Sequence, residues 1–126
     1  MNPKVLLITD RPDFPQLGAQ MLVLSGIKIS VRDHNIANNE ISAADLEGYN
    51  LILINMYERE SDSVGICRKL RTEYRNPILV LTHEKDEYFV LRAYKAGADD
   101  CLVQPMSSPL LLAKVQAWLL RTQMYP

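Results

Sequence analysis

The sequence predicts an α/β fold in which parallel β-strands alternate with α-helices. Unbroken apolar runs occupy residues 5–8, 51–54 and 78–81. These runs are too short for buried helices and are typical of strands that are covered on both faces. The segments between them repeat apolar residues at helical spacing, and parallel strands need such helical crossovers. The predicted sheet therefore carries helices on both faces.

The first half of the chain supplies three of the predicted strands. The first strand is Lys4–Thr9, and Pro12 suits the first turn of a helix that continues to about Ser25 and ends at Gly26. The apolar residues that recur at helical spacing in this helix are Phe14, Leu17, Met21, Leu22 and Leu24. Residues 27–31 alternate and predict a half-covered strand. A polar loop at 33–40 and a short helix at about 42–46 lead to the third strand, 51–54.

The second half repeats this alternation twice. Ser61 or Asp62 is expected to cap a helix with Val64, Cys67 and Leu70 on one face, and strand 78–81 follows it. A helix from about Glu87 to Ala96, a short strand at 101–103 and a final helix from 107 or 108 to about 122 complete the chain. Five strands alternating with five helices predict the flavodoxin-like order 2-1-3-4-5.

Composition limits the function. The length of 126 residues predicts a single domain. The net charge of −1 gives the domain no overall electrostatic attraction to nucleic acid or to a membrane. Cys67 and Cys101 lie far apart, so free thiols in a reducing compartment are expected, and the absence of a signal peptide or apolar span predicts a cytoplasmic protein. His34 and His83 are isolated from other metal ligands, and no Gly-rich loop follows the first strand. We therefore expect no zinc, nucleotide or flavin cofactor.

Polar residues follow three strands that should end on one rim of the sheet. These residues are Thr9 and Asp10, Asn55, and Thr82. Ligands and chemistry collect beyond the carboxyl ends of such strands, where the strand order reverses. Asn55 therefore stands where a reactive group is expected, although an amide has no ionisable proton and is a poor nucleophile.

Two motifs give the chain a family resemblance. Residues 97–106 read GADDCLVQPM, and the segment from Leu51 to the CRKLR sequence at 67–71 matches a strand–loop–helix motif without a gap. Over nearly its whole length the chain resembles the CheY-like receiver domain of two-component response regulators, most of all receivers of the OmpR/PhoB type. In an unrelated fold, by contrast, Asn55 would only cap a loop.

The resemblance implies a role for each position at the rim. Such receivers accept a phosphoryl group on an Asp at the end of the third strand, and this position is Asn55. Mg²⁺ is held by an acidic pair, here Thr9 and Asp10, and by a backbone carbonyl, here that of Tyr57. The hydroxyl switch is kept as Thr82. The switch aromatic becomes Cys101, and the Lys before the closing Pro becomes Gln104.

These substitutions predict a pseudo-receiver that works without phosphorylation. Phosphoryl transfer needs positioning and charge neutralisation, and Mg²⁺ typically takes one or two carboxylates. Asp10 is the one negative ligand left, Arg11 beside it opposes a cation, and Gln104 lacks the charge of a Lys. We therefore expect no bound Mg²⁺. Arg11 or Arg59 filling the place of the lost cation is an open hypothesis, beside the alternative that both point into water.

Other acceptors for the phosphoryl group have to be considered. Ser61, Asp62 and Ser63 are candidates close to the third strand, but such residues more often cap a helix.

The last two helices carry more apolar surface than one core requires. Ser108, Leu111, Leu112, Val115 and Leu119 share the expected core face of the final helix, and Leu91 and Tyr94 that of the preceding one. Trp118 is expected to pack at the core edge. The predicted face for a symmetric homodimer comprises Phe89, Val90, Arg92, Ala93, Asp99, Asp100, Leu110, Ala113, Lys114, Ala117, Leu120 and Arg121. In OmpR/PhoB-type receivers, charged residues occupy the positions of Phe89, Val90 and Leu110 and form salt bridges across the dimer.

The function predicted from these patterns is regulatory, without enzyme activity. Residues 1–126 are expected to form a receiver-like domain that dimerises at the N-terminal end of a transcription regulator and meets DNA only through a further C-terminal domain. The alternatives are a stand-alone adaptor, a small-ligand sensor that uses the rim, and a phospho-switch with another acceptor.

Overall fold

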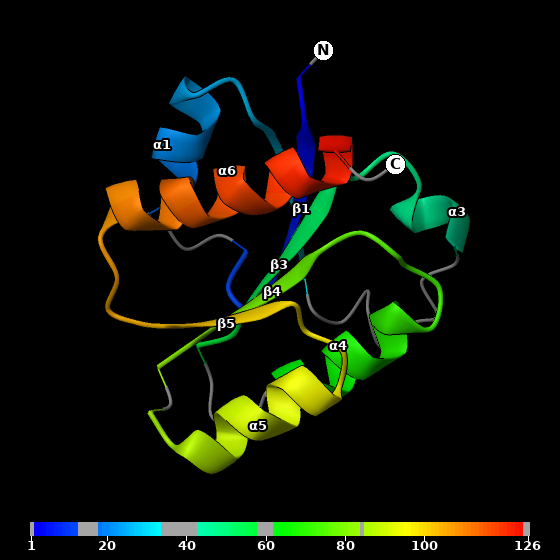
Figure 1. The fold of residues 1–126 in the computed structure, drawn as a ribbon, viewed down its shortest axis with the longest axis vertical. Coiled ribbons are helices and arrows are strands. Elements are labelled where there is room, and N and C mark those ends of the chain that lie inside the picture. The colour runs from blue at the N-terminus through cyan, green and yellow to red at the C-terminus, as the bar shows by residue number, and fades with distance from the viewer. Residues whose placement is uncertain (1, 13–17, 34–42, 58–61, 84, 125–126) are drawn as a thin grey trace.

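The protein folds around one parallel β-sheet (Figure 1). The computed structural model describes residues 2–12, 18–33, 43–57, 62–83 and 85–124. The strands are β1 (Lys4–Thr9), β2 (Lys28–Asp33), β3 (Leu51–Asn55), β4 (Ile78–Thr82) and β5 (Asp100–Val103). They pair in the order β2-β1-β3-β4-β5, each pair in parallel. The predicted fold class and strand order are confirmed.

Helices cover both faces of this sheet. They are α1 (Ala19–Leu24), α3 (Ala43–Leu46), α4 (Ser63–Arg71), α5 (Glu87–Lys95) and α6 (Ser108–Met124). In Figure 1, α1 and α6 lie on one side of the sheet, and α4 and α5 lie on the other. None of the helices in the described part of the chain is long and apolar enough to span a bilayer.

The two faces of the sheet take alternate residues of each strand. Leu6 and Ile8 of β1 pack in the core under α4 and α5. Val5 and Leu7 pack in a second core under α1 and α6. Because successive side chains of a strand point to opposite faces, an apolar run fills both cores at once.

Short polar signals fix the helix boundaries. The Asp62 carboxylate accepts a hydrogen bond of 2.8 Å from the backbone N–H of Gly65, which confirms its predicted role as a cap of α4. Asp86 caps α5 in the same way, through the N–H of Tyr88. Gly97 follows α5 with φ of +111°, a conformation that side-chain-bearing residues rarely adopt.

The N-terminal part of the sheet differs in detail from the prediction. Helix α1 begins at Ala19, and the predicted contributions of Phe14 and Leu17 lie outside the described residues. The first residue of the predicted helix at 42–46 and the capping candidate Ser61 also lie outside them. Strand β2 runs to Asp33 and is mostly exposed rather than half covered. It is the edge strand of the sheet, so only Ile29 of this strand packs against the core.

Helix α5 faces the core with a different side from the predicted one. Ala93 is fully buried and Ala96 nearly so, whereas Leu91 is 49% and Tyr94 44% exposed. The prediction that Leu91 and Tyr94 fill the core was therefore wrong, and Ala93 cannot belong to an exposed dimer face. Small alanine side chains let α5 approach the sheet closely, and Phe89 packs partly against the same core. The predicted core face of α6 is confirmed, since Leu111, Val115 and Leu119 are buried.

Candidate functional site

The rim at the carboxyl ends of the strands gathers most of the predicted site. Thr9 pairs with Asn55 in the β1–β3 register, and Thr82 pairs with Val103 in the β4–β5 register. Thr9 and Thr82 are buried, and Asn55 is half-buried. The prediction that these strand ends meet on one rim is confirmed, because a parallel sheet brings all carboxyl ends to the same edge.

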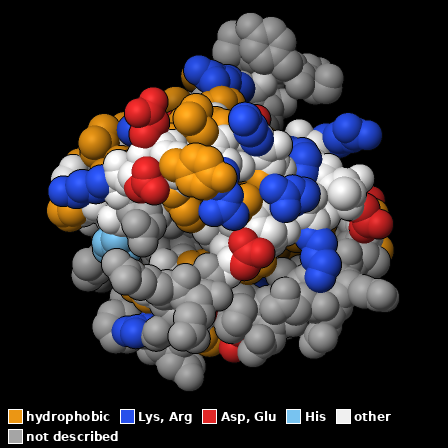
Figure 2. All heavy atoms as spheres, turned by 90° about the horizontal axis from the view of Figure 1, so that it is seen from below, with side chains coloured by type: hydrophobic (Ala, Val, Ile, Leu, Met, Phe, Trp, Pro, Cys, Tyr) orange, Lys and Arg blue, Asp and Glu red, His pale blue; other side chains and the backbone are white. Residues whose placement is uncertain are grey.

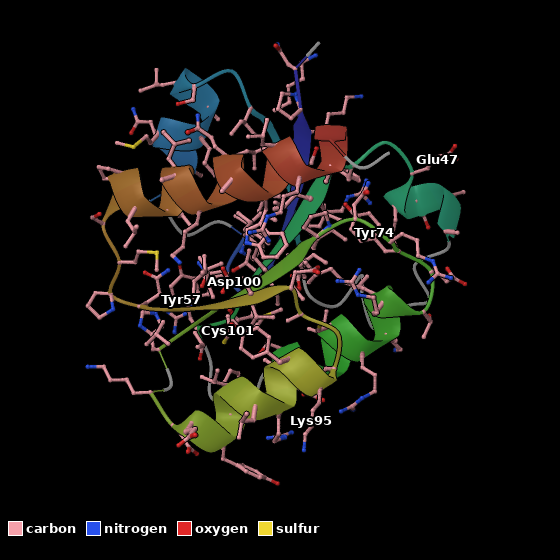
Figure 3. The ribbon with its side chains drawn as sticks, in the orientation of Figure 1. Glu47, Tyr57, Tyr74, Lys95, Asp100 and Cys101 are labelled. Carbon is pink, nitrogen blue, oxygen red and sulfur yellow. The ribbon has the colours of Figure 1, made fainter. Side chains whose placement is uncertain are left out.

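Asn55 and Asp10 are joined through Tyr57. The Asn55 side-chain Nδ2 donates a hydrogen bond of 3.1 Å to the Tyr57 hydroxyl, and the Tyr57 backbone N–H donates one of 2.9 Å to the Asp10 carboxylate. Both bonds tie residues that follow β1 and β3 into one short network. Figure 3 labels Tyr57 near the end of β5 where this rim lies.

Aromatic and cationic groups surround the Tyr57 ring. The Arg11 guanidinium carbon lies 5.6 Å from the centre of that ring. The His83 ring lies 6.2 Å from it, centre to centre, at a tilt of 37°. Arg11 thus contributes a cation–π contact beside Asp10. Arg59, the other arginine of the cation-replacement hypothesis, lies outside the described residues.

Gln104 lies directly beyond β5 on the same rim. Its backbone N–H donates to the Thr82 carbonyl at 2.7 Å, and its side-chain oxygen accepts from the Met106 N–H at 3.1 Å. The Gln104–Pro105 peptide is cis. The Gln104 side chain therefore stabilises the backbone of the β5–α6 connection, and it brings no positive charge to the rim.

Cys101 does not reach this rim. It pairs with Val80, two residues before the end of β5, and packs partly against the core under α4 and α5. Figure 3 places Cys101 on the α5 side of β5 and Asp100 on the α6 side. Burial, with a smaller contribution from the nearby Asp100 charge, raises the pKa of the Cys101 thiol to about 11. The side chain is a neutral thiol at physiological pH.

The donor groups at the rim do not fit a divalent cation well. At the carboxyl ends of the described strands, carboxylates belong to Asp10 and to Asp33, which ends the edge strand β2. One oxygen of Asp10 already accepts the Tyr57 N–H. The Thr9 hydroxyl accepts from the Arg11 N–H at 3.1 Å. Mg²⁺ demands six oxygen ligands in near-octahedral geometry, usually with carboxylates among them. Within the described ranges, no group of three or more His, Cys, Asp or Glu residues gathers to hold a metal.

The two acidic residues of the GADD motif are hydrogen-bonded to other elements of the same domain. The Asp99 carboxylate accepts from the Arg71 guanidinium at 2.5 Å and from the Ile78 N–H at 2.9 Å. The Asp100 carboxylate accepts from the Tyr94 hydroxyl and the Trp118 indole N–H, both at 3.2 Å. Asp100 therefore joins α5, β5 and α6, and neither residue is a simple surface charge.

Sequence reasoning missed the contacts that organise this region. The Arg71 guanidinium also donates to the carbonyls of Gly97, Tyr74 and Asn76. The only signal for it was the basic end of the CRKLR motif, which gives no hint of a partner 28 residues away. Trp118 packs at the core edge as predicted, and the Arg121 guanidinium lies 4.1 Å from the centre of its ring.

Helix geometry separates Arg92 and Leu120 from the other residues of the predicted dimer face. On α5, Arg92 is two residues from Tyr94, or about 200° around the helix, and lies over the Tyr88 ring at 5.8 Å. On α6, Leu120 has the same relation to Trp118. Arg92 and Leu120 are both exposed, but they point away from the side on which Tyr94 and Trp118 contact Asp100. Figure 2 shows the α4 and α5 side of the molecule, where hydrophobic side chains lie among basic and acidic ones.

Comparison with known proteins agrees with this architecture. The family model of the response regulator receiver domain matches residues 5–116. The transcriptional regulatory protein ResD of Bacillus subtilis is 29% identical over 119 residues, which cover 94% of this chain and 48% of ResD. The nisin biosynthesis regulatory protein NisR of Lactococcus lactis is 25% identical over 114 residues, which cover 90% of this chain and 49% of NisR. The chain thus spans about half the length of these curated relatives.

Solved structures give the same result. A two-component response regulator from Clostridium difficile superimposes with a TM-score of 0.74 at 27% identity, over 96% of this chain and 98% of that one. The receiver domain of the Francisella response regulator 1452 gives a TM-score of 0.76 at 25% identity, over 96% and 99% of the two chains. With the sheet order, the rim and the family match over residues 5–116 in agreement, the chain belongs to the response regulator receiver domain family.

Proposed function

We propose that this domain is a regulatory module that signals without phosphorylation at residue 55 and acts as a homodimer. The observation that carries the first part is Asn55 at the carboxyl end of β3, in the place of the acceptor carboxylate. The amide donates to Tyr57 and offers no negative oxygen to attack phosphorus. Thr9 and Gln104 also support a domain that is not phosphorylated at residue 55, because each replaces a charged group that phosphoryl transfer uses.

The phosphorylation part is tested by mass. The purified domain is incubated with acetyl phosphate and Mg²⁺ and weighed intact, and we expect no added phosphoryl group. The triple variant with Thr9→Asp, Asn55→Asp and Gln104→Lys restores each implied charge and serves as the positive control. Stoichiometric phosphorylation of the unaltered chain would refute the proposal and would point to another acceptor, such as Asp62 or Ser63.

The dimer part rests on exposed apolar groups beside the edge strand β5. Leu91 and Tyr94 of α5 are about half exposed, as is Leu110 of α6. Val90 is partly exposed and Ala117 exposed on the same two helices. We name these five residues the α5–α6 face. In Figure 1, β5 lies in front between α6 and α5, so this face is continuous with an open sheet edge.

Ion pairs contribute little to such a dimer. Asp99 and Asp100 of the predicted face are already bonded within the molecule, to Arg71 and to Tyr94 and Trp118. Lys114 and Arg121 remain as charges on the α6 side. Because apolar burial depends weakly on ionic strength, we expect association to persist at high salt, unlike an interface built on surface salt bridges.

Sedimentation velocity tests this interface. We expect Leu91→Glu to shift the domain to monomer, because burying an unpaired charge in an apolar interface is strongly unfavourable. The matched control is Leu24→Glu on α1, a leucine that is 80% exposed and lies off the face. A domain that is monomeric at high concentration, or a dimer that Leu24→Glu disrupts as much as Leu91→Glu, would contradict the proposal.

We further propose that the domain serves a transcription regulator in the cytoplasm. The support is that ResD and SrrA, which carry the name transcriptional regulatory protein, match over 94% and 98% of this chain but only about half of their own length. The regulator would then meet DNA through a C-terminal domain. Reading the natural gene past Pro126 tests this, and a stop codon there would favour a stand-alone adaptor.

A further inference from the structure

A cavity of about 170 Å³ lies beside the rim, between α1, the first turns of α6 and the sheet. Its walls are mostly apolar and include Leu22, Leu53, Leu81, Met106 and Leu111. The cavity is partly open to solvent, so a small molecule can reach it from outside the fold. A space of this size next to a ligand-binding edge of an α/β sheet is therefore a candidate site.

Uncharged polar groups lie at the rim end of the cavity. Asn55, Tyr57, Gln104 and Ser108 are among its lining residues, together with His83. Of the described residues that line it, none is Lys, Arg, Asp or Glu. A charged ligand would lose its hydration in this cavity without gaining a fixed opposite charge. The lining thus favours a neutral molecule that is apolar over most of its surface and polar at one end.

The volume sets the size of that molecule. An apolar cavity of roughly 150 Å³ is known to accept benzene, so 170 Å³ accommodates one six-membered ring with a small substituent. A hydroxyl or amide substituent can reach hydrogen-bonding groups such as Asn55 or Ser108, while the ring replaces water against the leucine side chains. We propose that this cavity binds a neutral one-ring aromatic molecule that carries a single hydrogen-bonding group, of the phenol class.

The place of the cavity gives binding a route to the rest of the domain. Ser108 and Leu111 line it from α6, and α6 also carries Trp118 and the Leu110 side of the α5–α6 face. A ligand that prefers one position of α6 would shift the population of that position, and dimerisation would in turn change ligand affinity. This inference goes beyond the proposed function, because ligand binding is measured on its own, whatever the outcome with acetyl phosphate or in sedimentation.

The test uses phenol and toluene, which share the ring and differ in the hydroxyl. Each is titrated into the domain while methyl resonances are followed by NMR. We expect saturable binding of phenol, with shifts at Leu53, Leu81 and Leu111, and an affinity for toluene that is weaker by roughly threefold or more. Lack of saturable phenol binding, shifts confined to other parts of the molecule, or equal affinity for the two compounds would each overturn the proposal.

Two variants place the ligand in the cavity. Ala19 lines it from α1, so Ala19→Leu should fill the space and abolish phenol binding. Ala44→Leu on α3 adds the same side chain at an exposed position elsewhere and should leave binding unchanged. Circular dichroism checks that both variants fold. In Asn55→Leu, whose fold is checked in the same way, we expect the preference for phenol over toluene to shrink. Unchanged phenol affinity in a folded Ala19→Leu domain would refute the site.

Discussion

Replacing Arg71 with alanine should destabilise the domain more than any exposed arginine can. The guanidinium donates two hydrogen bonds to the Gly97 carbonyl, at 2.9 and 2.6 Å, and one each to the carbonyls of Tyr74 and Asn76. It also pairs with Asp99 at 2.5 Å. One side chain thus ties the end of α4 to the connections before β4 and β5. In Arg71→Ala these carbonyls and the Asp99 carboxylate lose their charged donor together.

The magnitude follows from the number of bonds and from their exposure. A hydrogen bond to a charged group contributes about 1.5–3 kcal/mol when it is well buried. The Arg71 and Asp99 side chains are 24% and 34% exposed, so water replaces part of the loss and the contributions do not add fully. We therefore expect Arg71→Ala to lower the free energy of unfolding by about 2–4 kcal/mol.

Urea denaturation followed by circular dichroism measures this loss. Arg68→Ala is the matched control, because Arg68 lies exposed on the same turn of α4 and should change stability by less than about 0.5 kcal/mol. Arg71→Lys should fall between the two, since a lysine keeps the charge but lacks the planar fork. A loss below about 1 kcal/mol in Arg71→Ala, with an unchanged m-value, would refute this reasoning.

Two further predictions concern the core beside α5. Ala93→Leu should destabilise the domain by about 1–3 kcal/mol through overpacking, whereas Lys95→Leu at an exposed position of the same helix should cost less than about 0.5 kcal/mol; comparable losses in urea would mean that α5 is oriented otherwise. Burial raises the pKa of the Cys67 thiol from 9.0 to about 11, against the opposing charge of Arg71. The folded state thus favours the neutral thiol, so this contribution to stability is complete below about pH 9 and is lost as the pH rises towards 11. Between pH 9 and 11, the urea midpoint should fall less steeply with pH in Cys67→Ala than in the unaltered domain. Parallel curves of midpoint against pH would show that the Cys67 thiol does not cause the loss of stability.

The strands and the rim could be predicted because each depends on a local pattern and one topological rule. Runs such as LILI at 51–54 are continuous because the two cores take alternate residues, and parallel pairing then brings Thr9, Asn55 and Thr82 to one edge. The orientation of α5 could not be predicted in this way. Its apolar residues form two stripes, and the close approach of the helix to the sheet, which favours Ala93 over Leu91, appears only in the fold.

The polar contacts of Asp99 and Asp100 could not be predicted from the sequence for a related reason. In the sequence Asp99 and Asp100 are two charges beside a strand, and an exposed dimer rim is the natural interpretation. Their partners come from Arg71 and Trp118, which are 28 and 18 residues away. Side-chain hydrogen bonds over such distances depend on how three elements pack, and no spacing rule anticipates them.

The contact between Trp118 and Asp100 offers a way to observe the domain without labels. Trp118 is the single tryptophan of the chain, and its indole lies between a carboxylate and the Arg121 guanidinium at the side of β5. Indole emission responds to nearby charge and to the exclusion of water. The emission maximum or intensity of Trp118 should therefore change when a second molecule covers this side of the domain. A dilution series can then follow association at micromolar concentrations.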